Sequence, residues 1–231
     1  MITSENRVVA LLGAPGTGKS TQTRRLRQSD IDCLIASVPL LKRWDEDLTE
    51  HLSSFQAAQL SRVRGAAERA KRAGRLAPLA YDRVLFDLVA RSRASLVALD
   101  GCPRGVEQVR MYMNDESLLG RTTFILLDFP GDLIERSVRR QCERAARKGQ
   151  HVGRAQLTLF RAKVCTFLEQ TLKGVGLLER MDVTVHRLDA ESGEEDIHRA
   201  IMALIPATRG PCARRSYAAQ FLGPAAEAAT P

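Results

Sequence analysis

The amino-acid sequence predicts an α/β protein in which helices cover both faces of a parallel, five-stranded sheet, giving three layers. Two observations lead to this prediction. Short apolar runs of strand length alternate along the chain with longer segments of helical periodicity. Several of these runs end at Gly or Asp, as buried strands do where they enter a loop. In such sheets ligands bind beyond the carboxyl ends of the strands, so the loops that follow the strands are the first candidates for a site.

The expected elements follow one another in a regular order. The expected strands are 7–12, 32–36, 95–99, 122–128 and 183–188. The expected helical segments are 19–28, 39–91 with interruptions at Gly74 and Pro78, 132–147, 156–172 and 194–204. After 205 the composition changes to Ala, Gly, Pro and Arg with little periodicity. This pattern predicts one domain at 1–205 and a flexible C-terminal tail at 206–231.

The composition excludes several classes of protein. The chain has 44% hydrophobic and 27% charged residues, which is typical of a globular domain and not of a fibre. No apolar run approaches the roughly 20 residues that span a bilayer, and the polar segment 1–6 lacks the layout of a signal peptide. The five cysteines form no Cys-x-x-Cys pair, so a zinc knuckle is not expected. Scattered cysteines of odd number agree with a reducing compartment. We therefore expect a cytoplasmic protein that does not bind membranes.

The net charge of +8 suggests an anionic partner. The basic residues are dispersed over several expected helices, and an aromatic content of 5% is too low for a base-stacking platform. A cleft that binds polyphosphate accounts for the charge as well as nucleic acid does. We therefore expect nucleotide-sized partners, no nucleic acid, and a monomer.

The most specific motif lies between the first expected strand and the first expected helix. Residues 13–20 read Gly-Ala-Pro-Gly-Thr-Gly-Lys-Ser and fit the pattern G-x-x-x-x-G-K-[ST]. Glycines let backbone N–H groups wrap around phosphate oxygens, and the following helix presents its positive end to the same anion. Lys19 is expected to reach the terminal phosphates, and the Ser20 hydroxyl to ligate Mg²⁺. The residues expected to bind ATP are Gly13, Ala14, Pro15, Gly16, Thr17, Gly18, Lys19, Ser20 and Thr21.

An acidic residue completes the expected metal site. Asp100 directly follows the apolar run 95–99, and sites of this type place a second acidic group near the metal at the end of a strand. Since Asp also caps helices and forms turns, the combination with the loop at 13–20 is more informative than either feature alone. Ser20 and Asp100 are the predicted Mg²⁺ ligands.

Four stretches together resemble the adenylate kinase branch of the nucleoside monophosphate kinases. They are the extended loop at 13–22, Ala-Gly-Arg-Leu-Ala-Pro at 73–78, Leu-Asp-Gly-Cys-Pro-Arg-Gly-Val-Glu-Gln at 99–108, and Leu-Asp-Phe-Pro-Gly at 127–131. They occur in the family's order up to about residue 205, and Asp-Gly-x-Pro-Arg is the most specific of them. The resemblance implies a P-loop NTPase fold with a helical insert for the monophosphate at about 37–91 and a short lid at about 136–155.

The resemblance also implies an activity, the transfer of the γ-phosphoryl of MgATP to a nucleoside monophosphate. Arg104 would clamp the acceptor phosphate, and Gln108, in the same helix, would contact the base and favour AMP. The other implied acceptor-binding residues are Ser37, Lys42, Arg75 and Gly101. The implied catalytic cations are Lys19, Arg104 and the lid residues Arg136, Arg140 and Arg154, with Lys163 near them.

The acceptor side and the lid depart from the family's pattern. Residues 37–40 read Ser-Val-Pro-Leu, Lys42 replaces an Arg, Cys102 replaces an aromatic residue, and no Asp pair follows Arg154. The donor side matches more completely. Three functions therefore stay open: an AMP kinase, a kinase of UMP, CMP or another small metabolite, and a nucleotide-binding regulatory protein with weak turnover.

Overall fold

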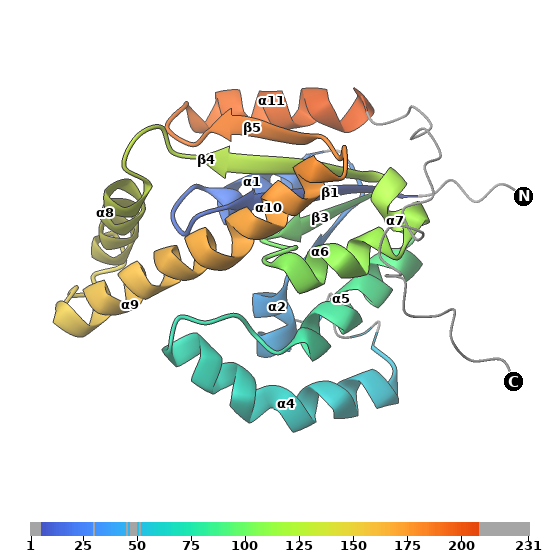
Figure 1. Ribbon diagram of the computed structural model, residues 1–231, viewed down its shortest axis with the longest axis horizontal. Coiled ribbons are helices and arrows are strands. Elements are labelled where there is room, and N and C mark those ends of the chain that lie inside the picture. The colour runs from blue at the N-terminus through green and yellow to red at the C-terminus, as the bar shows by residue number, and fades with distance from the viewer. Residues whose placement is uncertain (1–5, 30, 45, 47–49, 51, 208–231) are drawn as a thin grey trace, which may run out of the picture.

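A parallel sheet forms the centre of the fold (Figure 1). The computed structural model of the 231-residue chain describes residues 6–29, 31–44, 46, 50 and 52–207. All neighbouring strands are parallel and pair in the order β2-β3-β1-β4-β5. The strands are β1 (Arg7–Gly13), β2 (Cys33–Ala36), β3 (Leu96–Asp100), β4 (Thr122–Asp128) and β5 (Val185–Asp189). The predicted five-stranded parallel sheet is confirmed.

Helices cover both faces of this sheet, because the side chains of each strand point alternately to opposite sides. On one face Val9 and Leu11 of β1 belong to a core formed with α1 and α11. On the other face Val8, Ala10 and Leu12 belong to a larger core formed with α5, α6 and α10, and with α2 and α4 beyond them. The predicted three-layer arrangement is therefore confirmed.

The helices agree with the sequence pattern in most places. They are α1 (Lys19–Gln28), α2 (Val38–Arg43), α4 (Ser54–Arg72), α5 (Leu79–Arg91), α6 (Val106–Met113), α7 (Glu116–Gly120), α8 (Leu133–Ala146), α9 (Arg154–Thr166), α10 (Leu172–Arg180) and α11 (Glu194–Ala207). The predicted interruptions at Gly74 and Pro78 separate α4 from α5. Neither α6 nor α7 is among the helical segments predicted from periodicity, because helices of eight and five residues show little helical period. A helix at Gln108 was expected only from the resemblance.

The predicted helix 156–172 is too short at both ends. It begins at Arg154, passes through a π-helical turn, η1 (Phe167–Thr171), and continues as α10 to Arg180. Glycines weaken a helix intrinsically, but Gly174 packs against the start of α6. A Cβ added there would lie 3.2 Å from the carbonyl carbon of Gly105, so the close approach favours a glycine. Packing between helices therefore extends this helix beyond its sequence pattern.

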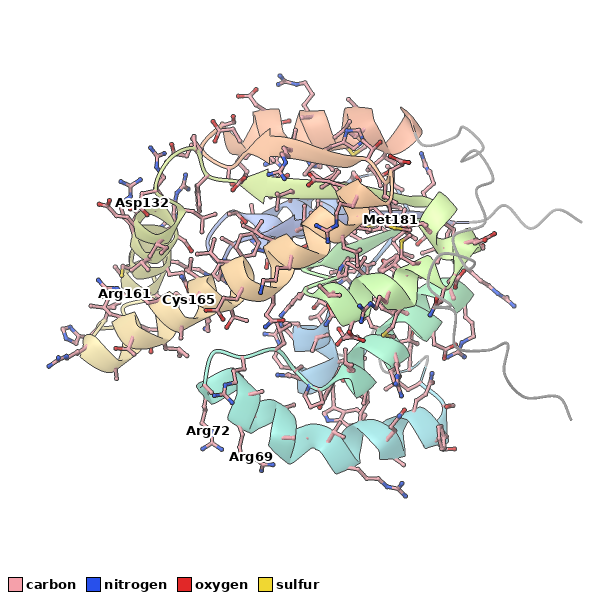
Figure 2. The ribbon with its side chains drawn as sticks, in the orientation of Figure 1. Arg69, Arg72, Asp132, Arg161, Cys165 and Met181 are labelled. Atoms are coloured by element: carbon pink, nitrogen blue, oxygen red, sulfur yellow. The ribbon has the colours of Figure 1, made fainter. Side chains whose placement is uncertain are left out.

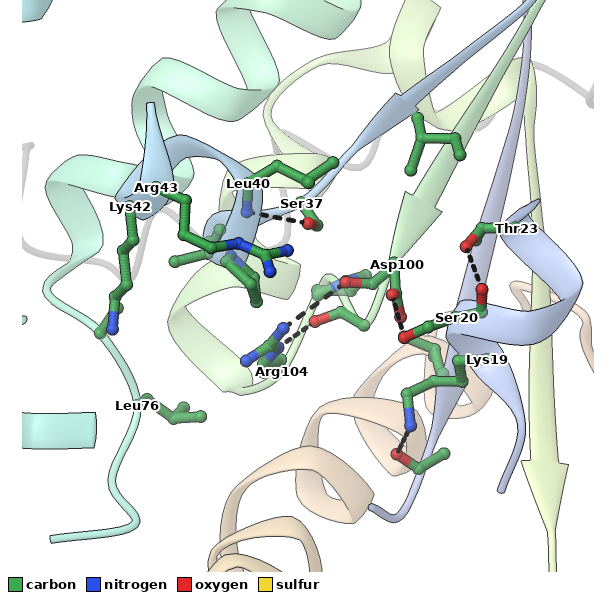
Figure 3. A pocket seen from close by; sticks show the side chains of 18 of the residues that line it. Lys19, Ser20, Thr23, Ser37, Leu40, Lys42, Arg43, Leu76, Asp100 and Arg104 are labelled. Atoms are coloured by element: carbon green, nitrogen blue, oxygen red, sulfur yellow. Dashed lines mark hydrogen bonds between the residues drawn. The ribbon is translucent and has the colours of Figure 1, made fainter. Parts of the chain in front are cut away.

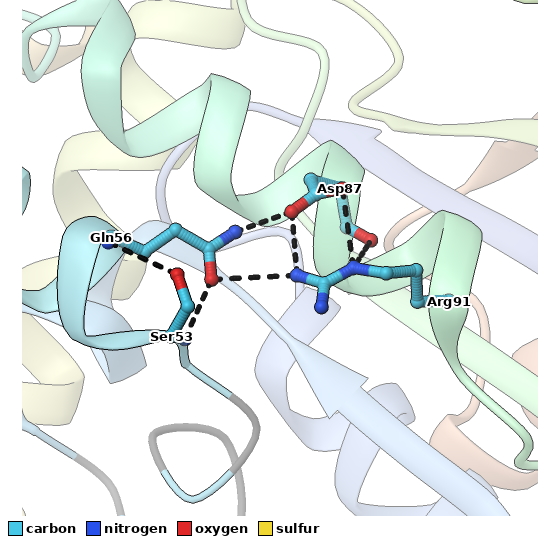
Figure 4. A network of polar contacts seen from close by, with 4 residues as sticks. All are labelled: Ser53, Gln56, Asp87 and Arg91. Atoms are coloured by element: carbon cyan, nitrogen blue, oxygen red, sulfur yellow. Dashed lines mark hydrogen bonds and ion pairs between the residues drawn. The ribbon is translucent and has the colours of Figure 1, made fainter.

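The helices of the predicted insert, 37–91, are held together by polar contacts (Figure 4). Ser53 and Gln56 form a capping box at the start of α4, with Gln56 N–H donating to Ser53 Oγ at 3.2 Å. The Gln56 amide also donates to the Asp87 carboxylate on α5, which pairs with Arg91 one turn further on. These contacts fix α4 against α5, so the insert presents one defined wall to the space next to the sheet.

The chain beyond the last helix lies largely outside the described residues. Helix α11 includes 206 and 207, where the tail was expected to begin, and the remainder of the predicted tail, 208–231, is not described. Among the helices that are described, none combines the length and the apolar character needed to cross a bilayer.

Candidate active site

A cleft of about 1380 Å³ opens beyond the carboxyl ends of β1, β2 and β3, between the sheet and the insert (Figure 3). This is the place at which an open parallel sheet binds ligands. Its walls come from the loop after β1, from α2 and α4, from the loop after β3, and from α8 and α9. The predicted site residues that line it are Gly13, Pro15, Lys19, Ser20, Ser37, Lys42, Arg75, Asp100, Gly101 and Arg104.

The glycine-rich loop, residues 13–20, connects β1 to α1 and has a conformation that most side chains exclude. Gly13, Gly16 and Gly18 have φ angles of 145°, 93° and 92°, in the region that favours glycine. A Cβ on Gly13 would also lie 2.5 Å from the carbonyl oxygen of Leu127 on β4. Ala14 and Thr17 are buried behind the loop, where Thr17 Oγ1 donates to the Ala14 carbonyl at 2.9 Å. The loop is thus preformed and open to an anion on its outer side.

Lys19 lies at the centre of the loop. Its Nζ donates to the carbonyl oxygens of Gly13 and Ala14, both at 2.8 Å. Burial of the ammonium group lowers the Lys19 pKa from 10.5 to about 8; the Asp100 carboxylate opposes this change and the Arg104 charge adds to it. Lys19 Nζ also donates to Thr17 Oγ1 at 3.4 Å. A buried cation whose hydrogen-bond acceptors are neutral oxygens gains strongly from a nearby anion.

Ser20 and Asp100 meet as the sequence predicts, although 80 positions separate them. Ser20 Oγ donates to Asp100 Oδ2 at 2.7 Å, because β1 and β3 are neighbouring strands that end at the same edge. Among the described residues no cluster of three or more His, Cys, Asp or Glu side chains forms a closed metal site. One hydroxyl and one carboxylate instead suit Mg²⁺, which keeps several water ligands and takes others from phosphates. The pair therefore fits the predicted metal position.

Arg104 lies across the same edge of the sheet, in the loop after β3. Its guanidinium donates to the carbonyl oxygens of Gly101 and Asp100, the latter at 3.5 Å (Figure 3). The expectation that Arg104 and Gln108 share a helix is wrong, since α6 begins at Val106 and Gly105 is its N-cap. Because Arg104 precedes the helix, its side chain lies at the cleft wall, close to the Ser20–Asp100 pair.

Gln108 is directed into the protein interior. It is 3% exposed, its side-chain oxygen accepts from the Arg104 N–H, and it is not among the described residues that line the cleft. Asp82 of α5 lies in the same interior region at 1% exposure, and burial raises its pKa to about 6, with the Arg104 charge opposing the rise. In this conformation Gln108 shapes the Arg104 loop and has no surface with which to contact a ligand.

The remaining predicted acceptor residues lie on the insert side of the cleft. Ser37 is the N-cap of α2, and its Oγ accepts from the Leu40 N–H at 3.3 Å. Lys42, in the last turn of α2, donates to the Ala67 carbonyl at 3.2 Å and lines the cleft. Arg75 is exposed and follows the turn at Gly74. Lys42 and Arg75 are therefore available to an anion, whereas the Ser37 hydroxyl is used in helix capping.

The three predicted lid arginines do not lie among the described lining residues. Arg136 pairs with Glu191, Arg140 packs beside Gly16 of the glycine-rich loop, and Arg154 is exposed at the start of α9. The predicted lid segment, 136–155, covers most of α8, the connection that follows it and the first residues of α9, and these two helices form a hairpin. Arg144 and Lys163 line the cleft from this hairpin instead. The helical period identifies Arg144, because it lies one turn beyond Arg140 on the same face of α8.

Two threonines of the long helix connect it to the acceptor side of the cleft. Thr166 Oγ1 donates to the Gly74 carbonyl and Thr171 Oγ1 to the Arg104 carbonyl, each at 2.9 Å. Thr166 directly precedes the π-helical turn η1 and Thr171 is its last residue, and such turns are frequent at functional sites. The sequence gives no signal for either contact, since both join segments more than 60 residues apart.

Compared with models of known protein families, the chain matches none of them, and the curated proteins likewise give no match. The geometry of the cleft is therefore the basis for assigning a function.

Proposed function

We propose that this protein is a P-loop phosphotransferase that moves the γ-phosphoryl of MgATP to a nucleoside monophosphate, AMP being the favoured acceptor. The observation that carries the proposal is the 2.7 Å contact between Ser20 and Asp100, beside Lys19 at the mouth of a preformed glycine-rich loop. The loop, the metal ligands and Arg104 come from three segments, and all line one cleft. Phosphoryl transfer requires this convergence of cations and donors more than it requires covalent chemistry.

The residues divide into a donor side and an acceptor side. Backbone N–H groups of the loop and the start of α1 would hold the β- and γ-phosphates, while Lys19 exchanges its loop carbonyls for phosphate oxygens. Mg²⁺, held by Ser20, Asp100 and the phosphates, would neutralise charge on the triphosphate. Arg104 would orient the acceptor phosphate for in-line attack, and Lys42 and Arg75 would bind the acceptor from across the cleft.

A second candidate is a kinase of UMP, CMP or another small phosphorylated metabolite. The burial of Gln108 favours it, because the residue that would select adenine does not line the cleft. A regulatory nucleotide-binding protein with weak turnover is a third candidate, and the position of Arg136, Arg140 and Arg154 outside the cleft favours it. The cytoplasmic, monomeric state inferred from the sequence stays a prediction.

The test is an assay of ADP formation from MgATP with AMP, CMP, UMP and GMP, run alongside calorimetric titration of ATP. Turnover that is fastest with AMP supports the proposal in full. Preference for another monophosphate retains the mechanism and changes the acceptor. ATP binding without turnover on any monophosphate contradicts the proposal and favours the regulatory candidate.

Affinity for ATP is expected to fall as the pH rises above about 8. The Lys19 pKa is about 8 in the free site, and the charged form binds phosphate, so above pH 8 binding must take up a proton. Each further pH unit is expected to weaken binding about tenfold until the pKa of the complex is reached. Titration calorimetry in buffers of different ionisation enthalpy measures this proton uptake, which the Lys19→Met variant should lack. Equal affinity at pH 7.5 and 9.5 would exclude this role for Lys19.

Removing the two threonine contacts is expected to weaken acceptor binding selectively. Thr166→Val and Thr171→Val keep the side-chain shape and delete hydroxyls that position the Gly74 turn and Arg104. Each loss leaves one carbonyl without its donor, so we expect the KM for the acceptor to rise about threefold to tenfold, with the affinity for ATP unchanged. Steady-state kinetics with each substrate varied in turn separates these effects. Restoration by Thr→Ser and no effect of Thr158→Val, an exposed threonine of α9, are the controls.

A further inference from the structure

The cleft as a whole contains a large excess of positively charged residues. Twelve Lys and Arg residues and four Asp and Glu residues are among the described residues that line the cleft. Three of the lysines, Lys42 of α2, Lys71 of α4 and Lys163 of α9, come from three separate helices; we call them the lysine cluster. Helices that meet at a cleft do not bring three ammonium groups together for stability, because like charges repel.

Lys71 acts electrostatically on both other members of the lysine cluster. Burial lowers the pKa of Lys42 and of Lys163, and the charge of Lys71 lowers both further. The Glu68 carboxylate, 3.9 Å from Lys71 Nζ, raises the pKa of Lys42 in turn. Arg144 of α8 adds a fourth positive charge that acts on Lys163. Neighbouring cations that repel one another in a cleft are stabilised by an anion placed between them.

The lysine cluster is distinct from the position at which phosphoryl transfer would occur. Arg104 lies at the edge of the sheet and contacts Asp100 and Gly101, next to Ser20. In Figure 3 the Lys42 side chain runs toward Leu76 on the insert side, with Arg104 across from it. The Arg104 charge also lowers the pKa of Lys42, so Lys42 lies between the two positions. The cleft thus has one cationic position beside the metal ligands and a second one between the insert and α9.

Neighbouring residues on the same helices provide a comparison. Arg72 follows Lys71 on α4 and Arg161 precedes Lys163 on α9, and both are exposed and absent from the described lining residues. Figure 2 shows Arg69 and Arg72 at the outer side of α4. Each of these two helices therefore has basic residues outside the cleft and one lysine that lines it, of which Lys71 is itself exposed.

We propose that the acceptor carries a second phosphate group, which the lysine cluster binds while Arg104 binds the first. The substrate class is then a bisphosphorylated small molecule, such as a nucleoside bisphosphate, and the simple monophosphate is the weaker ligand. This inference rests on the proposed phosphotransferase function and makes its acceptor more specific.

The experiment compares three ligands that share a base and a 5′-phosphate: AMP, adenosine 2′,5′-bisphosphate and adenosine 3′,5′-bisphosphate. Each is titrated into the full chain with Mg²⁺ and a saturating non-hydrolysable ATP analogue, so that only the acceptor side is free. At least one bisphosphate is expected to bind about tenfold more tightly than AMP. Lys71→Ala and Lys163→Ala should reduce this ratio toward one, Lys71→Arg should retain it, and the charge-matched controls Arg72→Ala and Arg161→Ala should leave it unchanged.

Equal affinity for AMP and both bisphosphates would overturn the inference. So would a bisphosphate-to-AMP affinity ratio that stays unchanged in Lys71→Ala and Lys163→Ala. A loss of ATP affinity in those variants would also overturn it, because it would place the lysine cluster on the donor side. The proposed function is judged separately, by phosphorylation of each ligand with MgATP. A bisphosphate that binds through the lysine cluster without being phosphorylated supports this inference and contradicts the phosphotransferase.

Discussion

Replacing Lys19 by alanine is expected to lower the rate of phosphoryl transfer about 10³-fold. In the free protein Lys19 Nζ is held 2.8 Å from the carbonyl oxygens of Gly13 and Ala14, so the charge is already in place at the loop before a phosphate arrives. Negative charge on the transferring phosphoryl oxygens changes between ground state and transition state, and a preorganised cation stabilises it without a cost in reorganisation. A neutral methyl group leaves that charge unopposed.

The measurement is kcat for ADP formation with saturating MgATP and acceptor. Because Lys19 also holds two loop carbonyls, the melting temperature of the variant is compared with that of the wild type. Thr17→Val gives a comparison for loop stability, since it removes the Oγ1 contacts to the Ala14 carbonyl and to Lys19 Nζ and leaves the charge. Activity of Lys19→Ala within about tenfold of the wild type, with the fold intact, would show that the loop does not hold a reacting phosphate.

The elements next to the sheet could be predicted because their signals are local. The strand 122–128 and the helix 19–28 have the predicted bounds, since an apolar run or a helical period identifies each. The predicted bounds of the long helix stop before its real end at Arg180, because Gly174 interrupts the helical pattern of the sequence. The close contact of Gly174 with Gly105 accounts for a glycine within this helix. Contacts of this kind depend on the tertiary fold and cannot be predicted from a short stretch of sequence.

In the candidate site, too, the features set by local sequence could be predicted and those set by tertiary packing could not. The meeting of Ser20 and Asp100 could be predicted, because both follow strands and parallel strands end at one edge. The position of Gln108 could not, since one turn of helix decides whether a side chain at the start of α6 faces the cleft or the interior. Lys71 and Arg144 were missed for a related reason, because the face that each presents depends on how the insert and the hairpin pack against the sheet.

Replacing Arg104 by alanine is expected to reduce kcat/KM for the acceptor about 10²-fold to 10³-fold while the affinity for ATP changes little. The guanidinium lies next to the Ser20–Asp100 pair, yet its hydrogen bonds are to the Asp100 and Gly101 carbonyls, which leaves other N–H groups for a phosphate. Arg104→Lys is expected to recover only a small part of the loss, because an ammonium cannot form two parallel hydrogen bonds to phosphate.

Varying ATP and the acceptor separately assigns the loss to one substrate. Arg110→Ala is the matched control, because this arginine is on the exposed side of α6 and pairs with Glu107, at 2.6 Å, in a surface contact of little energetic value. A loss in Arg104→Ala that appears equally in the affinity for ATP would mean that Arg104 mainly maintains the shape of the loop after β3. A loss confined to the acceptor, together with weak rescue by lysine, would place the acceptor phosphate between Arg104 and the metal ligands, as in-line transfer requires.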